Sequence, residues 1–182
     1  MMHPDTKELI ENWEAKSAQI NIENLDGLYN KFITVYTIYN RLYNESFSIL
    51  KNENRLTKSR YGDTGRATIL VVEFLGAQNI VDKFIERNQA DLDGINNLLA
   101  NNVFNINLEE GNPKTEMDNQ LMINLKSVDV SIKSQAVLFL IYNVRNNIIH
   151  GYKDFQEYQR LIVEPLINLL ESLIQLFKEK LQ

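Results

Sequence analysis

The sequence predicts an all-α fold, arranged as a single-domain bundle of about five to six helices. Only seven of the 182 residues are glycine and three are proline, so long uninterrupted segments are expected. Within those segments the apolar residues recur at spacings of three and four, which is the period of a helix and not the alternation of a strand. The length suits one domain over residues 1–182 and is sufficient to bury a hydrophobic core.

The composition narrows the classes of protein that the chain can belong to. No cysteine is present, which excludes a disulfide scaffold, a thiolate metal site and a cysteine nucleophile, and fits a reducing compartment. The net charge of -5 argues against binding of nucleic acid through an overall basic surface, although a local basic site stays open. No apolar run approaches the roughly 18 residues that cross a bilayer, and the first residues lack the order of a signal peptide. We therefore expect a cytoplasmic protein without a membrane partner.

Two helices are predicted at the start of the chain. The first covers roughly residues 5–19, and Asp5 and Glu8 are placed as its capping box. The second runs from residue 26 to about residue 51, with an apolar stripe along about seven turns. The members of that stripe are Leu28, Phe32, Val35, Tyr36, Tyr39, Leu42, Tyr43, Phe47 and Leu50.

The middle of the chain alternates between polar segments and further helices. Residues 52–65 form a basic loop in an acidic protein. A third helix is expected from residue 64 or 66 to residue 88, and a shorter fourth helix over 91–101. The polar stretch 105–119 contains glycine and proline and is predicted to be a surface loop.

The fifth predicted helix covers about residues 131–149 and contains the unbroken apolar run 136–142. A helix that is apolar on all sides belongs in the centre of a bundle. Gly151 is well placed as the residue that ends this helix.

The last predicted helix extends to about residue 180. Asp154 and Glu157 have the spacing of a capping box before it. Pro165 lies inside it and is expected to kink the helix or split it in two.

One group of residues, at the end of the fifth predicted helix, has side chains suited to catalysis. The sequence has two histidines, and because His3 lies in an N-terminus that we expect to fray, histidine chemistry falls on His150. At about 100° per residue, Asn146 lies about 40° from His150 on the same face, whereas Arg145 lies about 140° away. Cooperation between Arg145 and His150 therefore requires a frayed helix end or a second subunit.

These residue types meet the needs of metal-free phosphodiester cleavage. An imidazole can move a proton, a guanidinium can hold a phosphate through two hydrogen bonds, and an amide can orient the substrate. In RNA the nucleophile is the substrate's own 2′-hydroxyl. A structural interpretation stays open, because a histidine at a helix C-terminus also stabilises the helix dipole and a neighbouring arginine also caps carbonyls or forms a salt bridge.

The segment 145–150 resembles the R-x(4 to 6)-H motif of the HEPN superfamily, a group of small helical domains many of which are ribonucleases. An asparagine directly after the arginine is frequent in that family, as are the buried helix before the motif and the amphipathic helix after it. Residues 32–43 resemble the aromatic-then-Asn-x-Leu-Tyr helix of several HEPN families. The resemblance spans roughly residues 26–180.

The resemblance implies a metal-independent endoribonuclease without a cofactor, in which two copies form one composite cleft. His150 is then the acid and base, Arg145 the phosphate ligand and Asn146 the orienting amide. The superfamily's members act in toxin-antitoxin, abortive-infection and CRISPR systems, which implies a toxin or an antiphage effector with RNA as substrate. The alternative is a catalytically silent HEPN-like module that binds a nucleotide, RNA or a protein partner.

Three further residues are candidates for substrate binding. Tyr152 extends the pattern to R-x4-H-x-Y, which resembles HEPN toxins whose partner is an antitoxin nucleotidyltransferase that can block the tyrosine by adenylylation; a purely structural aromatic is the other interpretation. Asn40 interrupts the aromatic stripe and faces either the cleft or solvent. Lys153, with Lys133, brackets the motif helix and is a candidate for contacts to the RNA backbone.

Overall fold

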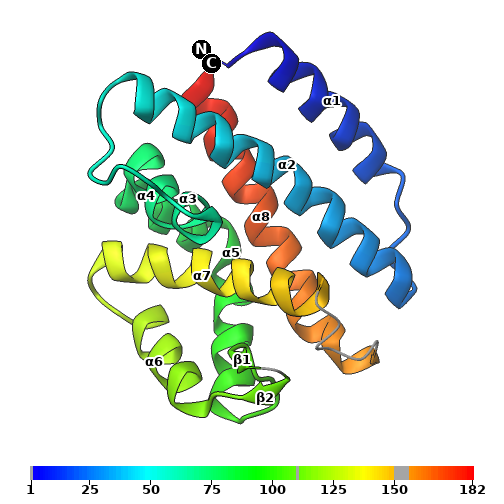
Figure 1. The fold of residues 1–182 in the computed structure, drawn as a ribbon. Coiled ribbons are helices and arrows are strands. Elements are labelled where there is room, and N and C mark those ends of the chain that lie inside the picture. Colours follow the sequence, from blue (N-terminus) through cyan, green and yellow to red (C-terminus); the bar gives the residue numbers. More distant parts are fainter. Residues whose placement is uncertain (1, 110, 150–155) are drawn as a thin grey trace.

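The computed structural model describes residues 2–109, 111–149 and 156–182, and it confirms the all-α fold (Figure 1). Besides the helices, these residues contain one short antiparallel hairpin. The elements, in chain order, are α1 (Pro4–Ala18), α2 (Leu25–Asn52), α3 (Asp63–Ala67), α4 (Ile69–Leu75), α5 (Ala77–Ala100), β1 (Leu108–Glu109), β2 (Asn112–Pro113), α6 (Thr115–Leu125), α7 (Val130–Ile149), the 3-10 turn η1 (Glu157–Gln159) and α8 (Arg160–Leu181).

Long helices form the body of the bundle. The helix α2 packs against α8 and α1, and α8 packs against α5. Their shared core is aromatic: Tyr39 is fully buried and its ring meets those of Tyr43 and Phe177 edge to face, at 5.3 and 6.1 Å between centroids. The predicted stripe on α2 supplies much of this core, because its spacing places those side chains on one side of the helix.

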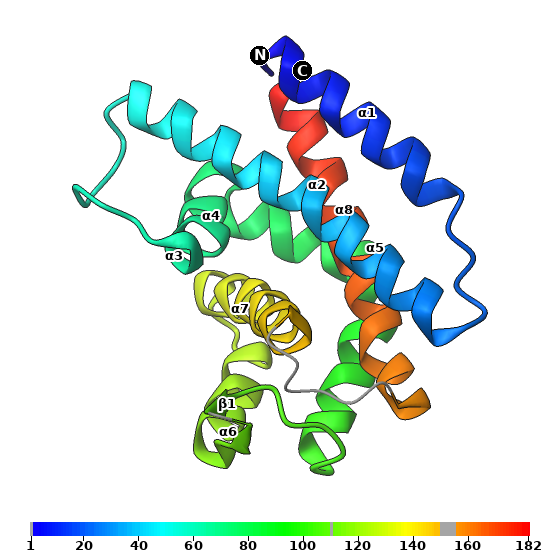
Figure 2. The ribbon, with the colours of Figure 1, turned by 45° about the vertical axis from the view of Figure 1, so that its right-hand side comes forward.

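The helix α7 lies on the other side of the bundle. Figure 2 shows it nearly end-on, with α3 and α4 on one side and α6 on the other, and it packs against all three and against α5. Val137, Leu138, Leu140 and Ile141 are buried, but Ile132 and Ile149 are exposed, so α7 is buried along part of its circumference and not on all sides as predicted. No helix within the described ranges is long and apolar enough to span a membrane.

The start of α1 differs from the prediction. His3 is the N-cap residue, and its Nδ1 accepts a hydrogen bond from the Asp5 backbone at 3.3 Å, while Pro4 takes the first helical position. The backbone nitrogen of His3 also donates to Glu45 on α2 at 3.1 Å. The expected capping box of Asp5 and Glu8 is therefore wrong, and His3 is tied to α2 where fraying was expected.

The predicted third helix is interrupted twice. Thr68 has φ -124° and ψ -74°, which separates α3 from α4. Gly76 has φ 92°, a conformation that favours glycine and ends α4. After Gly76, the end of the predicted third helix and the whole predicted fourth helix form one helix, α5. The break expected between them is a kink at Asn88.

The polar stretch 105–119 is not a loop throughout. It contains the hairpin of β1 and β2, and α6 begins at Thr115. Glycine and proline predicted a surface loop here, and they do lie in the turn: Gly111 has φ 83°. The signal for α6 was hidden because its first turn shares the polar composition of that turn.

The helix α8 continues through Pro165, so the predicted split is wrong. Proline has no backbone N–H and so cannot donate a hydrogen bond to the carbonyl of the residue four before it. Here that residue is Leu161 in the first turn of α8, so a single bond near the helix start is lost and the rest of the helix continues. The capping box that precedes the helix is formed by Gln156 and Gln159 at η1. The expected capping residue Asp154 and the expected helix end Gly151 lie outside the described residues.

The two ends of the described chain lie side by side (Figure 1). The backbone nitrogen of Met2 donates to the carbonyl of Leu181 at 3.0 Å. The helix α1 is therefore fastened to the end of α8 as well as along α2.

Candidate functional site

The motif residues Arg145 and Asn146 lie in the last turns of α7. Their side chains are hydrogen-bonded to each other, with Nη1 of Arg145 donating to Oδ1 of Asn146 at 3.0 Å. The other predicted site residues of this region, His150, Tyr152 and Lys153, lie outside the described residues.

The guanidinium of Arg145 rests on an aromatic ring of α2. Its Cζ atom lies 5.2 Å from the centroid of the Tyr36 ring, within the range of a cation–π contact. Its Nε is buried and has no hydrogen-bond partner in the part of the chain that the structure describes. No carboxylate of those residues forms an ion pair with it. Among the described residues, the charge of the half-buried Arg145 guanidinium is therefore met by a ring and an amide and by no carboxylate.

Tyr36 is a fixed support for that cation. It is 3% exposed, and its ring packs edge to face against Tyr39 at 5.7 Å between centroids. Burial raises the pKa of its hydroxyl, while the positive charge of Arg145 opposes that rise. The phenol therefore stays neutral and offers Arg145 a ring face without a negative charge.

Asn40, one turn beyond Tyr36, belongs to a polar network between α2 and α3. Its Nδ2 donates to the hydroxyl of Tyr43 at 2.5 Å, and that hydroxyl donates to Oδ1 of Asp63 at 2.8 Å. Asn44 donates to the Asn40 carbonyl and side-chain oxygens at 3.0 and 3.2 Å. Asn40 is half-buried, and its side chain is hydrogen-bonded to Tyr43 and Asn44. The alternative in which Asn40 simply points into solvent is therefore wrong.

Arg66 fastens the same network from α3. Its guanidinium lies 4.2 Å from the Phe47 ring centroid, and it donates to Oδ1 of Asn44 and to the Tyr61 carbonyl, each at 3.2 Å. Asp63 and Asn44 were not among the predicted site residues. One signal could have found Asn44: Tyr36, Asn40 and Asn44 follow each other at intervals of four along α2.

The second amide of the motif segment, Asn147, makes different contacts from Asn146. It is 6% exposed, and its Nδ2 donates to the Ile106 carbonyl at 2.7 Å. Asn143, one turn earlier, donates to Oδ1 of Asn107 at 2.9 Å. These bonds hold the segment before β1 against the side of α7 that faces away from Arg145.

Asp118 on α6 completes this attachment. Its carboxylate accepts from the backbone nitrogens of Ile106 and Asn107 at 3.2 and 2.8 Å, and from the Asn107 side chain at 2.7 Å. Asp118 is 8% exposed, so these bonds are protected from water. We call the side chains of Asn107, Asp118, Asn143 and Asn147 the amide clasp. It fixes the position of the end of α7, on which Arg145 and Asn146 lie.

Only part of the basic loop is available for a substrate. Arg55 is paired with Glu53 and Glu73, at 3.0 and 2.9 Å, and Arg66 is engaged as described above. Lys58 and Arg60 are exposed. Among the residues described, no group of three or more histidine, aspartate or glutamate side chains could hold a metal ion.

No protein-family model, curated protein or solved structure matches this chain. The resemblance to the HEPN superfamily therefore stays a prediction carried by the motif and its helical context. What the site can do chemically follows from its own side chains.

Proposed function

We propose that this protein is a metal-independent endoribonuclease of the HEPN type, acting as a homodimer. The observation that carries the proposal is the state of Arg145, a half-buried guanidinium held by Tyr36 and Asn146 and without a carboxylate partner in the described ranges. A positioned guanidinium of this kind is suited to bind a phosphate and to stabilise the negative charge that develops on it.

The proposed reaction is an internal transfer within the RNA chain. The 2′-hydroxyl oxygen forms a bond to the adjacent phosphorus, the bond from phosphorus to the 5′-oxygen breaks, and the products are a 2′,3′-cyclic phosphate and a 5′-hydroxyl. His150 accepts the proton of the 2′-hydroxyl, and a protonated imidazole, which a second copy can supply, donates a proton to the leaving oxygen. Arg145 binds the phosphate, and Asn146 orients the guanidinium and the substrate.

Two features support a composite site. The helical spacing separates Arg145 from His150 by about 140°, and the guanidinium of Arg145 is turned toward Tyr36 of its own chain. The angle of about 140° separates Arg145 and His150 of the same helix. It does not limit the His150 imidazole of a second copy, which can approach Arg145 from outside. Asn40 lies one turn from Tyr36 and is the proposed contact of the α2 side; Tyr152 and Lys153 are the proposed contacts that follow the motif.

The proposed biological role is that of a cytoplasmic toxin or antiphage effector. Free cleavage of RNA would harm the cell that makes it, so a controlling partner such as an antitoxin or a nucleotidyltransferase is part of the proposal. With a net charge of -5, the surface away from the site repels RNA, which favours selective over indiscriminate binding.

The decisive experiment compares two histidine variants. Purified wild-type protein, His150→Ala and His3→Ala are incubated with RNA, with and without EDTA, and the products are analysed for a 2′,3′-cyclic phosphate. We expect cleavage by the wild type and by His3→Ala, unaffected by EDTA, and none by a folded His150→Ala protein. Cleavage by the folded His150→Ala protein, or cleavage abolished by EDTA, would contradict the proposal.

A second candidate function is a binding module without catalysis. It is favoured by the same stacked Arg145, because holding an anion needs the guanidinium but no acid or base. Saturable binding of RNA by the wild type, lost in Arg145→Ala and accompanied by no cleavage, would establish this function in place of the first.

A further inference from the structure

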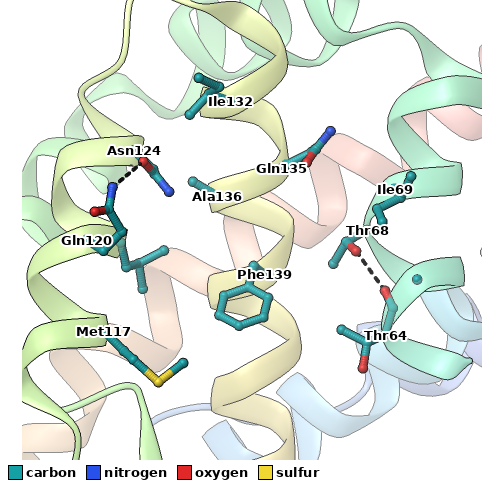
Figure 3. Close-up of a pocket in the computed structure, with 12 residues that line it drawn as sticks. Thr64, Thr68, Ile69, Met117, Gln120, Asn124, Ile132, Gln135, Ala136 and Phe139 are labelled. Carbon is teal, nitrogen blue, oxygen red and sulfur yellow. Dashed lines mark hydrogen bonds between the residues drawn. The ribbon is translucent and has the colours of Figure 1, made fainter.

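A pocket opens on the surface between three parts of the bundle. Figure 3 shows α7 along its middle, with α6 on one side and α3 with α4 on the other. Its volume is about 520 Å³, within the range of roughly 300–1,000 Å³ that is usual for small-molecule sites. None of the described residues that line the pocket carries a charge. It therefore suits an uncharged ligand, or an uncharged part of a larger ligand.

One end of the pocket is apolar and lies toward the motif. Phe139 of α7 and Met117 of α6 are found at this end (Figure 3); Phe139 is half-buried and Met117 is 45% exposed. A partly exposed aromatic ring beside a flexible thioether can stack against a flat ring. Asn146 follows Phe139 after about two turns, so the two residues share a face of α7 and are separated by about 10 Å along its axis.

The other end of the pocket carries amides that are free to bind a ligand. Nε2 of Gln120 donates to Oδ1 of Asn124 at 2.9 Å. Among the described residues, this leaves Nδ2 of Asn124 and the whole amide of Gln135 without a hydrogen-bond partner. Figure 3 shows that Asn124 comes from α6 and Gln135 from α7. The two side chains offer both donors and an acceptor to one ligand.

This combination of side chains indicates a class of ligand. A nucleobase is flat and uncharged, stacks on aromatic side chains and carries donors and acceptors along its edge. Asparagine and glutamine amides pair best with adenine, through its N6 donor and N7 acceptor, whereas arginine or lysine reads guanine and a carboxylate reads cytosine. The described lining has amides and no charged side chain, so it favours adenine.

We propose that this pocket binds the adenine base of a nucleotide close to the phosphate that the protein cleaves. The base stacks on Phe139, its edge is bound by the amides of Asn124 and Gln135, and the RNA chain continues toward Asn146 along the same face of α7. The inference deepens the proposed function and rests on it in one respect, that the base belongs to an RNA substrate.

The first test uses nucleosides, which report on the pocket without a phosphate. Adenosine and guanosine are titrated separately into the full chain labelled with ¹⁵N, and the chemical shifts are followed by nuclear magnetic resonance. We expect adenosine to shift the side-chain amide signals of Asn124 and Gln135. We also expect it to bind about 10-fold more tightly than guanosine, because guanine does not present the N6 donor.

Two glutamine variants assign the binding to the pocket. Gln135→Ala removes one amide at an exposed position, so the fold is preserved. Gln78→Ala is the matched control, because Gln78 is an exposed glutamine of α5 that does not line the pocket. We expect the affinity for adenosine to fall by about 10-fold in Gln135→Ala and to stay unchanged in Gln78→Ala.

Short RNAs connect the pocket with cleavage. A short oligoadenylate is expected to displace adenosine, and an oligouridylate of the same length is not. The wild type is expected to cleave RNA that has adenine close to the cleaved bond about 10-fold faster than RNA that has guanine there. Gln135→Ala should lose this preference.

Adenosine that shifts no signal of the pocket, or binds no more tightly than guanosine, would overturn the inference. Equal affinities of the Gln135 and Gln78 variants would do the same. Adenosine binding that oligoadenylate cannot displace would overturn the assignment of the base to an RNA chain. The titration needs no cleavage, so the two proposals are separable. Cleavage without adenosine binding contradicts the inference alone, whereas adenosine binding and its displacement by oligoadenylate without cleavage contradict the endoribonuclease alone.

Discussion

Arg145 and Tyr36 join two helices through a cation and a ring, with 5.2 Å between the guanidinium carbon and the ring centroid. The contact fixes the plane of the guanidinium, which a lysine ammonium could not reproduce. It gives the motif helix α7 a defined orientation toward α2, the helix that also carries Asn40.

Replacement of Arg145 by lysine is the first test of this contact. Lysine keeps the positive charge but loses the planar set of donors and the stacking on Tyr36. We expect cleavage of RNA to fall by about 100-fold or more, with a small change in the free energy of unfolding. Arg55→Lys, at an exposed ion pair of the basic loop, should keep its activity. Full activity in Arg145→Lys would show that charge alone is sufficient.

The neighbouring amides Asn146 and Asn147 should separate activity from stability. Asn147→Ala leaves the Ile106 carbonyl buried without its donor, so we expect a loss of about 1–3 kcal/mol in the free energy of unfolding. Among the described residues, the Asn146 side chain is hydrogen-bonded to Arg145 alone, so Asn146→Ala should change that free energy by less than about 0.5 kcal/mol while lowering the cleavage rate. Urea denaturation followed by circular dichroism measures the first effect. Equal destabilisation by both variants would contradict the assignment of Asn147 to the amide clasp.

Asp118→Ala should be the most destabilising change in the amide clasp. It removes the acceptor of two backbone donors and one side-chain donor at a buried position, and we expect a loss of about 3 kcal/mol. Asp129→Ala is the matched control. Asp129 also accepts from two backbone donors, of Ser131 and Ile132, but at an exposed helix start, where the loss is about 1 kcal/mol. The order of the two unfolding midpoints checks the prediction.

Buried tyrosines should make the fold sensitive to alkaline pH. Burial raises the pKa of Tyr29 to about 12, with a smaller contribution from Tyr158, and burial also raises the pKa of Tyr36, Tyr39 and Tyr43. In the unfolded chain these groups lose their protons near pH 10. The stabilisation is therefore complete below about pH 10 and is lost as the pH rises toward 12 and beyond, by about 1.4 kcal/mol per pH unit for each affected tyrosine.

The ultraviolet absorbance of tyrosinate measures this effect directly. Tyr29, Tyr36, Tyr39 and Tyr43 should stay protonated near pH 10 in the folded protein and should ionise together as the chain unfolds. Tyr29→Phe should reduce the loss of stability between about pH 10 and 12. Ionisation of all the tyrosines near pH 10 in the folded protein would contradict the prediction.

The sequence was sufficient to predict the helices that have a strong apolar period. The helices α2 and α7 begin and end within one residue of the prediction, because a continuous stripe or run of buried side chains defines them. The breaks at Thr68 and Gly76 were missed, since both residues stand inside a segment whose apolar spacing continues across them. Helix α6 was missed because its first turn is mostly polar and includes the buried Asp118, whose carboxylate is satisfied by a segment eleven residues earlier.

The sequence was sufficient to identify Arg145 and Asn146 as candidate site residues. It did not identify the residues of other helices that contact them. Those two residues are neighbours in the chain, and their spacing to His150 is visible in the sequence. The contact of Arg145 with Tyr36 depends on how α7 crosses α2, and the bond from Tyr43 to Asp63 depends on how α3 folds back on α2. Such contacts are set by packing between distant segments, which local patterns do not encode.

The backbone hydrogen bond between Met2 and Leu181 holds the start of α1 next to the end of α8. A short flexible linker between the two ends, with new ends opened among the exposed residues 57–60 of the basic loop, should leave the bundle intact. In such a permuted chain the ribosome would deliver α3 to α8 before α1 and α2. The permuted chain changes the order in which the helices are synthesised but keeps their contacts in the folded protein. It can therefore show whether α2 must be present before α7 packs into the bundle.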